Sequence, residues 1–69
     1  MTENQSAPVD FLARVWIRAV ALRGTPSIYA PIEAEVYRGE TLHITAEQDG
    51  LCRTEDGLWV LGAALKKQG

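Results

Sequence analysis

Alternating apolar and polar positions are the main structural signal in this chain. The clearest alternation lies at 41–47, where Leu42, Ile44 and Ala46 alternate with polar residues. Successive side chains of a strand point to opposite faces, so this pattern predicts a strand with one buried face. Glu33 and Glu35 likewise alternate with apolar residues, which predicts a second strand of this kind. Taken together, the predicted strands are 13–22, 32–37, 41–47, 51–54 and 58–61.

Glycine-centred turns separate these predicted strands. Asp49-Gly50 and Asp56-Gly57 supply the positive φ angles that tight hairpins require. Residues 62–65 suit a single 3₁₀ turn before a polar tail at 66–69. Short strands with a turn about every 8–12 residues are typical of all-β folds. We therefore expect a five-stranded, strongly bent barrel, since closure hides the sheet edges that a small open sheet would expose.

The first predicted strand has an imperfect alternation. Trp16, Val20 and Leu22 share their face with Arg18, which does not belong in a core. A bulge near Arg18 that switches the faces is the favoured interpretation, and partial cover of both faces is the alternative. Gly24 and Pro26 then end the strand, because neither suits a strand interior.

The first ten residues are mostly polar. They predict a flexible arm at 1–10 ahead of one domain at 11–69, although Asp10 could instead cap a helical turn. The segment lacks the basic start and apolar stretch of a secretory signal, and no apolar run approaches the ~20 residues of a membrane span. We expect a cytoplasmic protein that does not bind membranes, with a place in a virion as the alternative.

Composition narrows the range of ligands. The net charge is −2, which argues against binding to nucleic acid. One cysteine and one histidine are too few for a structural zinc site. We therefore expect neither a metal nor a cofactor, and stability must come from packing or from association.

Several segments resemble bacterial SH3-like domains. A hydrophobic strand ends in Arg23 and is followed by a small-residue turn with Pro26 and Ser27, which is similar to the opening signature of that family. The other matching segments are Pro31-Ile32, Arg38-Gly39-Glu40-Thr41-Leu42, Asp49-Gly50 and Asp56-Gly57-Leu58-Trp59-Val60. The resemblance covers roughly residues 14–65 and implies a non-catalytic binding module. Members of the family hold cell-wall hydrolases to peptidoglycan, bind peptides or act as spacers.

Catalysis is not expected from the polar residues. Cys52 and His43 would have to meet, with a third group orienting the imidazole, to act as nucleophile and base. A free cysteine on a strand is commonly a small buried residue, and His43 occupies an outward position. The carboxylates of the Asp49 and Asp56 turns predict a solvated acidic rim.

Aromatic and arginine residues are the best candidates for a binding surface, because tyrosine, tryptophan and arginine dominate binding hot spots. The candidates are Trp16, Arg18, Arg23, Tyr29, Tyr37 and Trp59. We expect a protein partner, with the chain acting as an adaptor or inhibitor of the kind that phage and mobile-element genes encode. A virion or assembly component, and a peptidoglycan-binding or peptide-binding module detached from its hydrolase, remain as alternatives.

Overall fold

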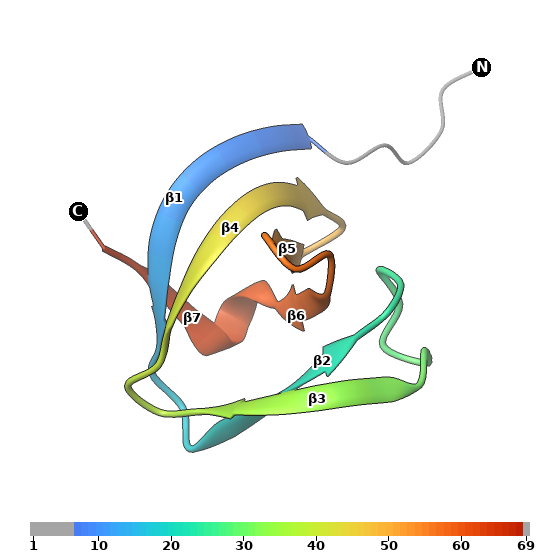
Figure 1. Cartoon of the computed structure of the whole chain (residues 1–69), viewed down its shortest axis with the longest axis horizontal. Helices are drawn as coiled ribbons and strands as arrows, with labels where there is room; N and C mark the ends of the chain where they lie inside the picture. Colours follow the sequence, from blue (N-terminus) through green and yellow to red (C-terminus); the bar gives the residue numbers. More distant parts are fainter. Residues whose placement is uncertain (1–6, 69) are drawn as a thin grey trace.

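The computed structural model describes residues 7–68, whose regular structure consists of β-strands and one 3₁₀ turn (Figure 1). The elements are β1 (Ala7–Val15), β2 (Ala19–Arg23), β3 (Ile32–Tyr37), β4 (Thr41–Gln48), β5 (Leu51–Thr54), β6 (Trp59–Leu61), the 3₁₀ turn η1 (Gly62–Ala64) and β7 (Leu65–Lys67). The all-β class predicted from the sequence is confirmed. Residues 1–6 of the predicted arm lie outside the described residues.

The central strands agree closely with the alternation in the sequence. Strands β3 and β5 have the predicted bounds, and β4 extends one residue further than predicted. Asp49 and Gly50 join β4 to β5 with φ angles of 51° and 81°, and Gly57 has a φ of 85° in the next turn. The Asp49-Gly50 turn therefore has both positive φ angles predicted for it, whereas in the Asp56-Gly57 turn only the glycine has one.

The N-terminal prediction is partly wrong. Residues 7–10 belong to β1 and not to an arm, and Ala7 pairs with Glu47 of β4. Asp10 accordingly caps no helix. The predicted strand at 13–22 is two strands, because the chain leaves the ladder at Trp16 and resumes at Ala19. Arg18 lies in the connection between these two strands, so the alternation that would have placed it on a buried face does not reach it, and no bulge is needed.

The C-terminal tail also contributes a strand. After η1, β7 pairs with β1, placing Lys67 opposite Ala13 and Leu65 opposite Val15. The sequence predicted only a polar tail here. Backbone pairing with a distant strand, which no local apolar pattern reports, orders these residues.

The strands form one antiparallel sheet in the order β3-β2-β6-β5-β4-β1-β7. The predicted five-stranded closed barrel is therefore wrong on both counts: residues 7–68 form seven strands, and β3 and β7 remain as edges. The count rises because the first predicted strand divides and the tail adds another. The sheet is nonetheless strongly curved, and it wraps around its own core (Figure 1).

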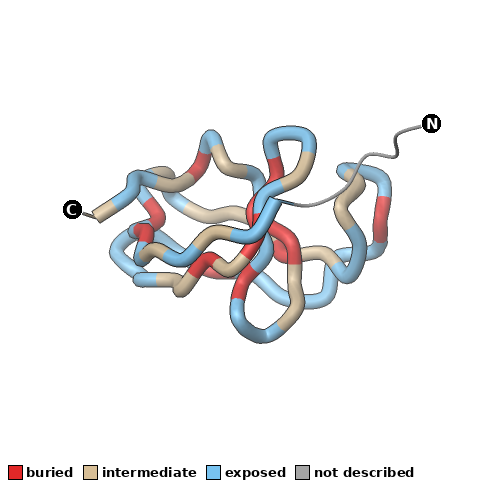
Figure 2. Tube along the Cα trace, turned by 90° about the horizontal axis from the view of Figure 1, so that it is seen from above, coloured by how far each residue is buried: buried red, intermediate tan, exposed pale blue. Residues whose placement is uncertain are grey.

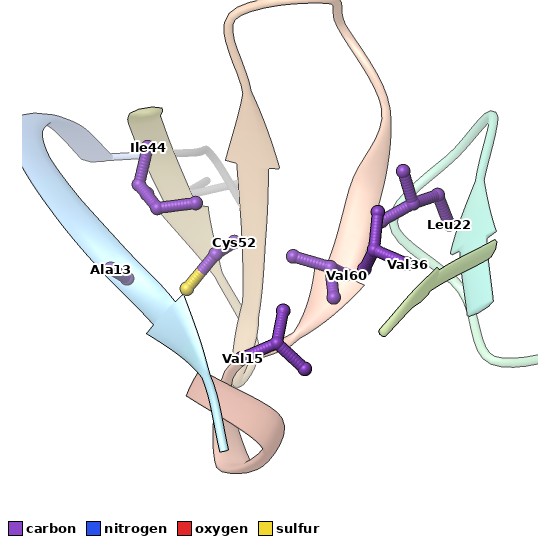
Figure 3. Packing of buried hydrophobic residues seen from close by; sticks show 7 residues of the cluster. All are labelled: Ala13, Val15, Leu22, Val36, Ile44, Cys52 and Val60. Carbon is purple, nitrogen blue, oxygen red and sulfur yellow. The ribbon is translucent and has the colours of Figure 1, made fainter. Parts of the chain in front are cut away.

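The main core lies inside this curve. Figure 3 shows one buried cluster that draws a residue or more from each of β1 to β6: Ala13, Val15, Leu22, Val36, Ile44, Cys52 and Val60. Val15, Ile44 and Val60 are fully buried. Stretches of buried residues along the chain are short and are separated by exposed residues, as the alternation of side chains in strands requires (Figure 2).

Candidate functional site

Strands β5 and β6 are buried on both faces. Cys52 and Val60 belong to the main core, yet their neighbours Leu51 and Trp59 are also buried, at 6% and 8% exposure. Consecutive strand residues point to opposite faces, so Leu51 and Trp59 must lie on the outer face of the sheet. They form a second cluster there with Ala46.

The loop between β2 and β3 covers this second cluster incompletely. A small hollow of about 110 Å³ remains between the loop and the sheet. Its lining residues are Val20, Ala21, Arg23, Ile28, Leu51, Trp59 and Leu61. Ile28 and Leu61 are 56% and 44% exposed, so the rim of the hollow is apolar and accessible.

A larger and more open hollow of about 700 Å³ shares two lining residues, Leu51 and Leu61, with the small one. It extends over the β4–β5 turn and the start of η1, with Glu47 and Asp49 at its far side. Both carboxylate residues are exposed. We refer to the two hollows together as the groove.

Close backbone contact fixes the floor of the groove. The N–H of Gly62 donates to the carbonyl of Gly50 at 2.9 Å, which ties η1 to the β4–β5 turn. A Cβ atom at position 62 would lie 3.0 Å from that same oxygen. Only glycine fits here without a shift of the turn.

Arg23 fixes the loop at the other end of the groove. Its Nη1 donates a 2.6 Å hydrogen bond to the carbonyl of Ala30, a buried residue at the end of the loop. Arg23 also pairs with Trp59 across β2 and β6. The loop is further shaped by the Oγ of Ser27, which accepts from the N–H of Tyr29 at 3.1 Å.

The structure brings together only some of the predicted binding residues. Arg23 and Trp59 meet at the groove, where Trp59 forms the floor and is almost fully buried. Tyr29 is next to Ile28 in the loop and is 89% exposed. Arg18 is exposed in the β1–β2 connection, where its carbonyl accepts from the N–H of Arg38.

The side chains of Trp16 and Tyr37 are half-exposed, and each donates a hydrogen bond to another group of the protein. The indole N–H of Trp16 donates to the carbonyl of Ala63 at 2.8 Å, and the ammonium of Lys66 lies 5.2 Å from the ring centroid. Trp16 therefore lies beside η1 and β7. The hydroxyl of Tyr37 donates to Glu35 at 2.8 Å, and this bond raises the pKa of the phenol. A binding role for these side chains remains a prediction.

Sequence reasoning missed three groove residues, namely Ile28, Leu51 and Leu61. Ile28 offered a signal, since an apolar residue within a loop that contains prolines indicates that the loop packs against other apolar side chains. Leu61 shares its strand face with Trp59, which is a second signal. Neither signal predicts that the β2–β3 loop lies over β6.

Cys52 and His43 are not brought together. Cys52 is part of the core, and its burial, with a smaller effect from Glu47, raises the pKa of the thiol. This shift favours the protonated form of the thiol. His43 instead contacts Asp10 and Glu55, with Nε2–Oδ1 and Nδ1–Oε1 distances of 2.5 and 3.1 Å.

Residues 7–68 contain neither a cluster of metal ligands nor a helical membrane span. No group of three or more histidine, cysteine, aspartate or glutamate side chains in this part of the chain is placed to hold a metal ion. Over the same residues, no helix has the length and apolarity needed to cross a membrane.

Comparison of the chain with protein-family models, with curated proteins and with solved structures finds no match.

Proposed function

We propose that this chain is a non-catalytic protein-binding module, an adaptor or inhibitor, that binds an apolar segment of its partner in the groove. The observation that carries the proposal is that Leu51 and Leu61 line both hollows. Ile28 and Leu61 expose apolar surface beside a nearly buried tryptophan. Apolar pockets with a few polar groups at their rim are the usual form of a recognition site.

Charge at the groove suggests the chemistry of the partner. Glu47 and Asp49 are exposed at one end, and no cation of residues 7–68 pairs with either. At the other end, the guanidinium of Arg23 is already bonded to Ala30. The segment that fits is therefore apolar with a lysine or arginine at the end that reaches Glu47 and Asp49.

The order of elements supports an SH3-like assignment for the fold. Three strands, β4 to β6, follow one another through tight turns, and a 3₁₀ turn precedes the last strand. That last strand returns to pair with the first. These features agree with the resemblance carried by Arg23, Pro26 and the two Asp-Gly turns, and the open sheet with seven strands is the variation that this chain adds.

A selected peptide tests the proposal. Peptides are enriched from a random library on the wild-type protein, and their sites are mapped by amide chemical-shift changes. We expect apolar peptides with a basic end, and shifts centred on Ile28, Leu51 and Leu61. Leu61→Asp should weaken binding about tenfold or more, because it places a charge against apolar surface.

Leu12→Asp is the matched control, since Leu12 is 49% exposed but lies outside the groove. It should leave the affinity unchanged. Equal loss in the two variants, or shifts elsewhere on the protein, would contradict the proposal. The wall-binding alternative requires a different outcome. The protein would then sediment with purified peptidoglycan, and Trp16→Ala or Tyr29→Ala would weaken that sedimentation.

A further inference from the structure

The open sheet has two free edges, formed by β3 and β7. Within residues 7–68, strand β3 pairs only with β2, and β7 pairs only with β1. An edge strand presents unpaired backbone N–H and C=O groups, which can add a strand from another chain. Figure 1 shows β3 along the lower border of the molecule and β7 leading to the C-terminus.

The register of β3 shows which residues face its free side. The N–H of Arg38 donates to the carbonyl of Arg18 just beyond the β2–β3 ladder. Inward and outward backbone groups alternate in an antiparallel ladder, so every second residue back along β3 also faces β2. Glu35 and Tyr37 therefore direct their backbone groups to the free side, and the alternation ends at Glu33, where the register of the ladder shifts.

One of these two positions is already occupied. The N–H of Tyr37 donates to the carboxylate of Glu40 at 2.8 Å. The free hydrogen-bonding groups of this edge are consequently those of Glu35, and the side chains of Glu33 and Glu35 are both exposed.

The free side of β7 follows from the same reasoning. The N–H of Gln68 donates to the carbonyl of Leu12 at 2.8 Å, and Lys66 lies opposite Arg14. Alternation then directs the backbone groups of Lys67 away from β1. This edge is basic, since Lys66 and Lys67 are both exposed.

The charges of the two edges have no ionic partners within residues 7–68. The ion pairs found in this part of the chain are the two at His43. Lys66 and Lys67 lie over the rings of Trp16 and Phe11, at 5.2 and 4.8 Å, which keeps both charges at the β7 edge. One edge is therefore acidic, and the other is basic.

From these edges we infer that copies of this chain associate head to tail, with β3 of one copy pairing with β7 of the next. Pairing of β3 with β3 would oppose glutamates, and pairing of β7 with β7 would oppose lysines, so both symmetric contacts are disfavoured. Pairing of β3 with β7 brings Glu33 and Glu35 to the basic edge, where Lys66 and Lys67 point to opposite faces of the sheet, so one of the two lysines shares the face of the glutamates. It is heterologous, so each added copy leaves one edge of each kind free and the assembly continues into a ring or a filament.

This contact is separate from the groove proposed as the binding site, because none of its four charged residues lines either hollow. The contact is also short, since β7 has three residues. Association is therefore expected at high protein concentration and low salt, where opposite charges are least screened.

Sedimentation velocity over a concentration series tests the inference. In low salt, the average mass of the wild-type protein should rise about twofold or more above the 7.6 kDa of one chain. It should return to the monomer value in about 1 M salt, where the screening length falls to about 3 Å. A wild-type protein that stays monomeric throughout the low-salt series would overturn the inference.

Charge-reversal variants identify the contact. Glu33→Lys with Glu35→Lys makes both edges basic, and Lys66→Glu with Lys67→Glu makes both edges acidic, so each variant should remain monomeric. The variant with all four substitutions has complementary edges again and the net charge of the wild type, so it should regain association.

Glu47→Lys with Asp56→Lys is the control, because it matches the first variant in charge but leaves both edges unchanged. It should associate like the wild type. Circular dichroism establishes that every variant is folded. Folded edge variants that still associate, or a folded four-site variant that stays monomeric, would contradict the contact.

Discussion

His43 and Asp10 join the middle of β4 to the irregular part of β1, with 2.5 Å between Nε2 and Oδ1. The register of the β1–β4 pair shifts between Pro8 and Phe11, which is where Asp10 lies. Glu55 approaches the other ring nitrogen of His43 at 3.1 Å. A ring bonded to carboxylates at both nitrogens satisfies them fully only when it is protonated.

These contacts predict a pH dependence of stability. The hydrogen bond to Asp10, and then that to Glu55, raise the pKa of His43 above its ordinary value of 6.5. Because the folded-state pKa is the higher one, the stabilisation is complete below pH 6.5 and is lost as pH rises through the folded pKa. His43→Gln should therefore lower the urea midpoint more at about pH 6 than at about pH 9.

A proton NMR titration measures this pKa directly, because His43 is the only histidine in the chain. Asp10→Asn should bring the titration closer to 6.5. A wild-type ring that titrates at or below 6.5 would show that the two carboxylates do not hold it.

Arg23→Met should loosen the loop that borders the groove. The substitution retains an apolar stem but removes the donor to the Ala30 carbonyl, which is buried. We expect a loss of about 1–2 kcal/mol in the free energy of unfolding, less than for a fully buried charged hydrogen bond. Amide exchange at 28–30 should accelerate, and Arg38→Met, an exposed arginine, is the control. Equal urea curves for the two variants would exclude the anchoring role.

Gly57→Ala should destabilise the protein through the backbone. Gly57 has a φ of 85°, whereas a Cβ at this position would meet only the end of the Arg53 side chain at 3.9 Å. The left-handed region costs a residue with a Cβ about 1–2 kcal/mol, which corresponds to about 5–15 °C in the melting temperature of a small domain. Gly24→Ala is the control, because Gly24 has no such φ. A similar melting temperature for both variants would count against strain at Gly57.

The sequence predicted the central strands well because local chemistry determines them. The alternation around Ile44 and the Asp49-Gly50 turn require no distant partner to be recognised. Residues 7–10 and Lys66 were misjudged for the opposite reason. Their strands are ordered by pairing of β1 with β4 and β7, and polar or small side chains give no local sign of it.

The candidate site was harder to predict than the strands. The sequence correctly drew attention to Arg23 and Trp59, which pair across β2 and β6. It could not show that the outer face of the sheet is covered, since Leu51 and Cys52 are both apolar and their burial on opposite faces depends on the path of the loop. Ile28 and Leu61 became candidates only when that loop was placed.

The pairing of Ala13 with Lys67 has a consequence for the order of folding. During synthesis, the first strand emerges early but can complete its ladder only after residue 67 has been added. Until then, the β7 side of β1 is an open edge. Contacts between such distant residues slow folding, and domains dominated by them fold in milliseconds to seconds. The hairpin of β4 and β5 can form sooner, and it offers β1 its first partner.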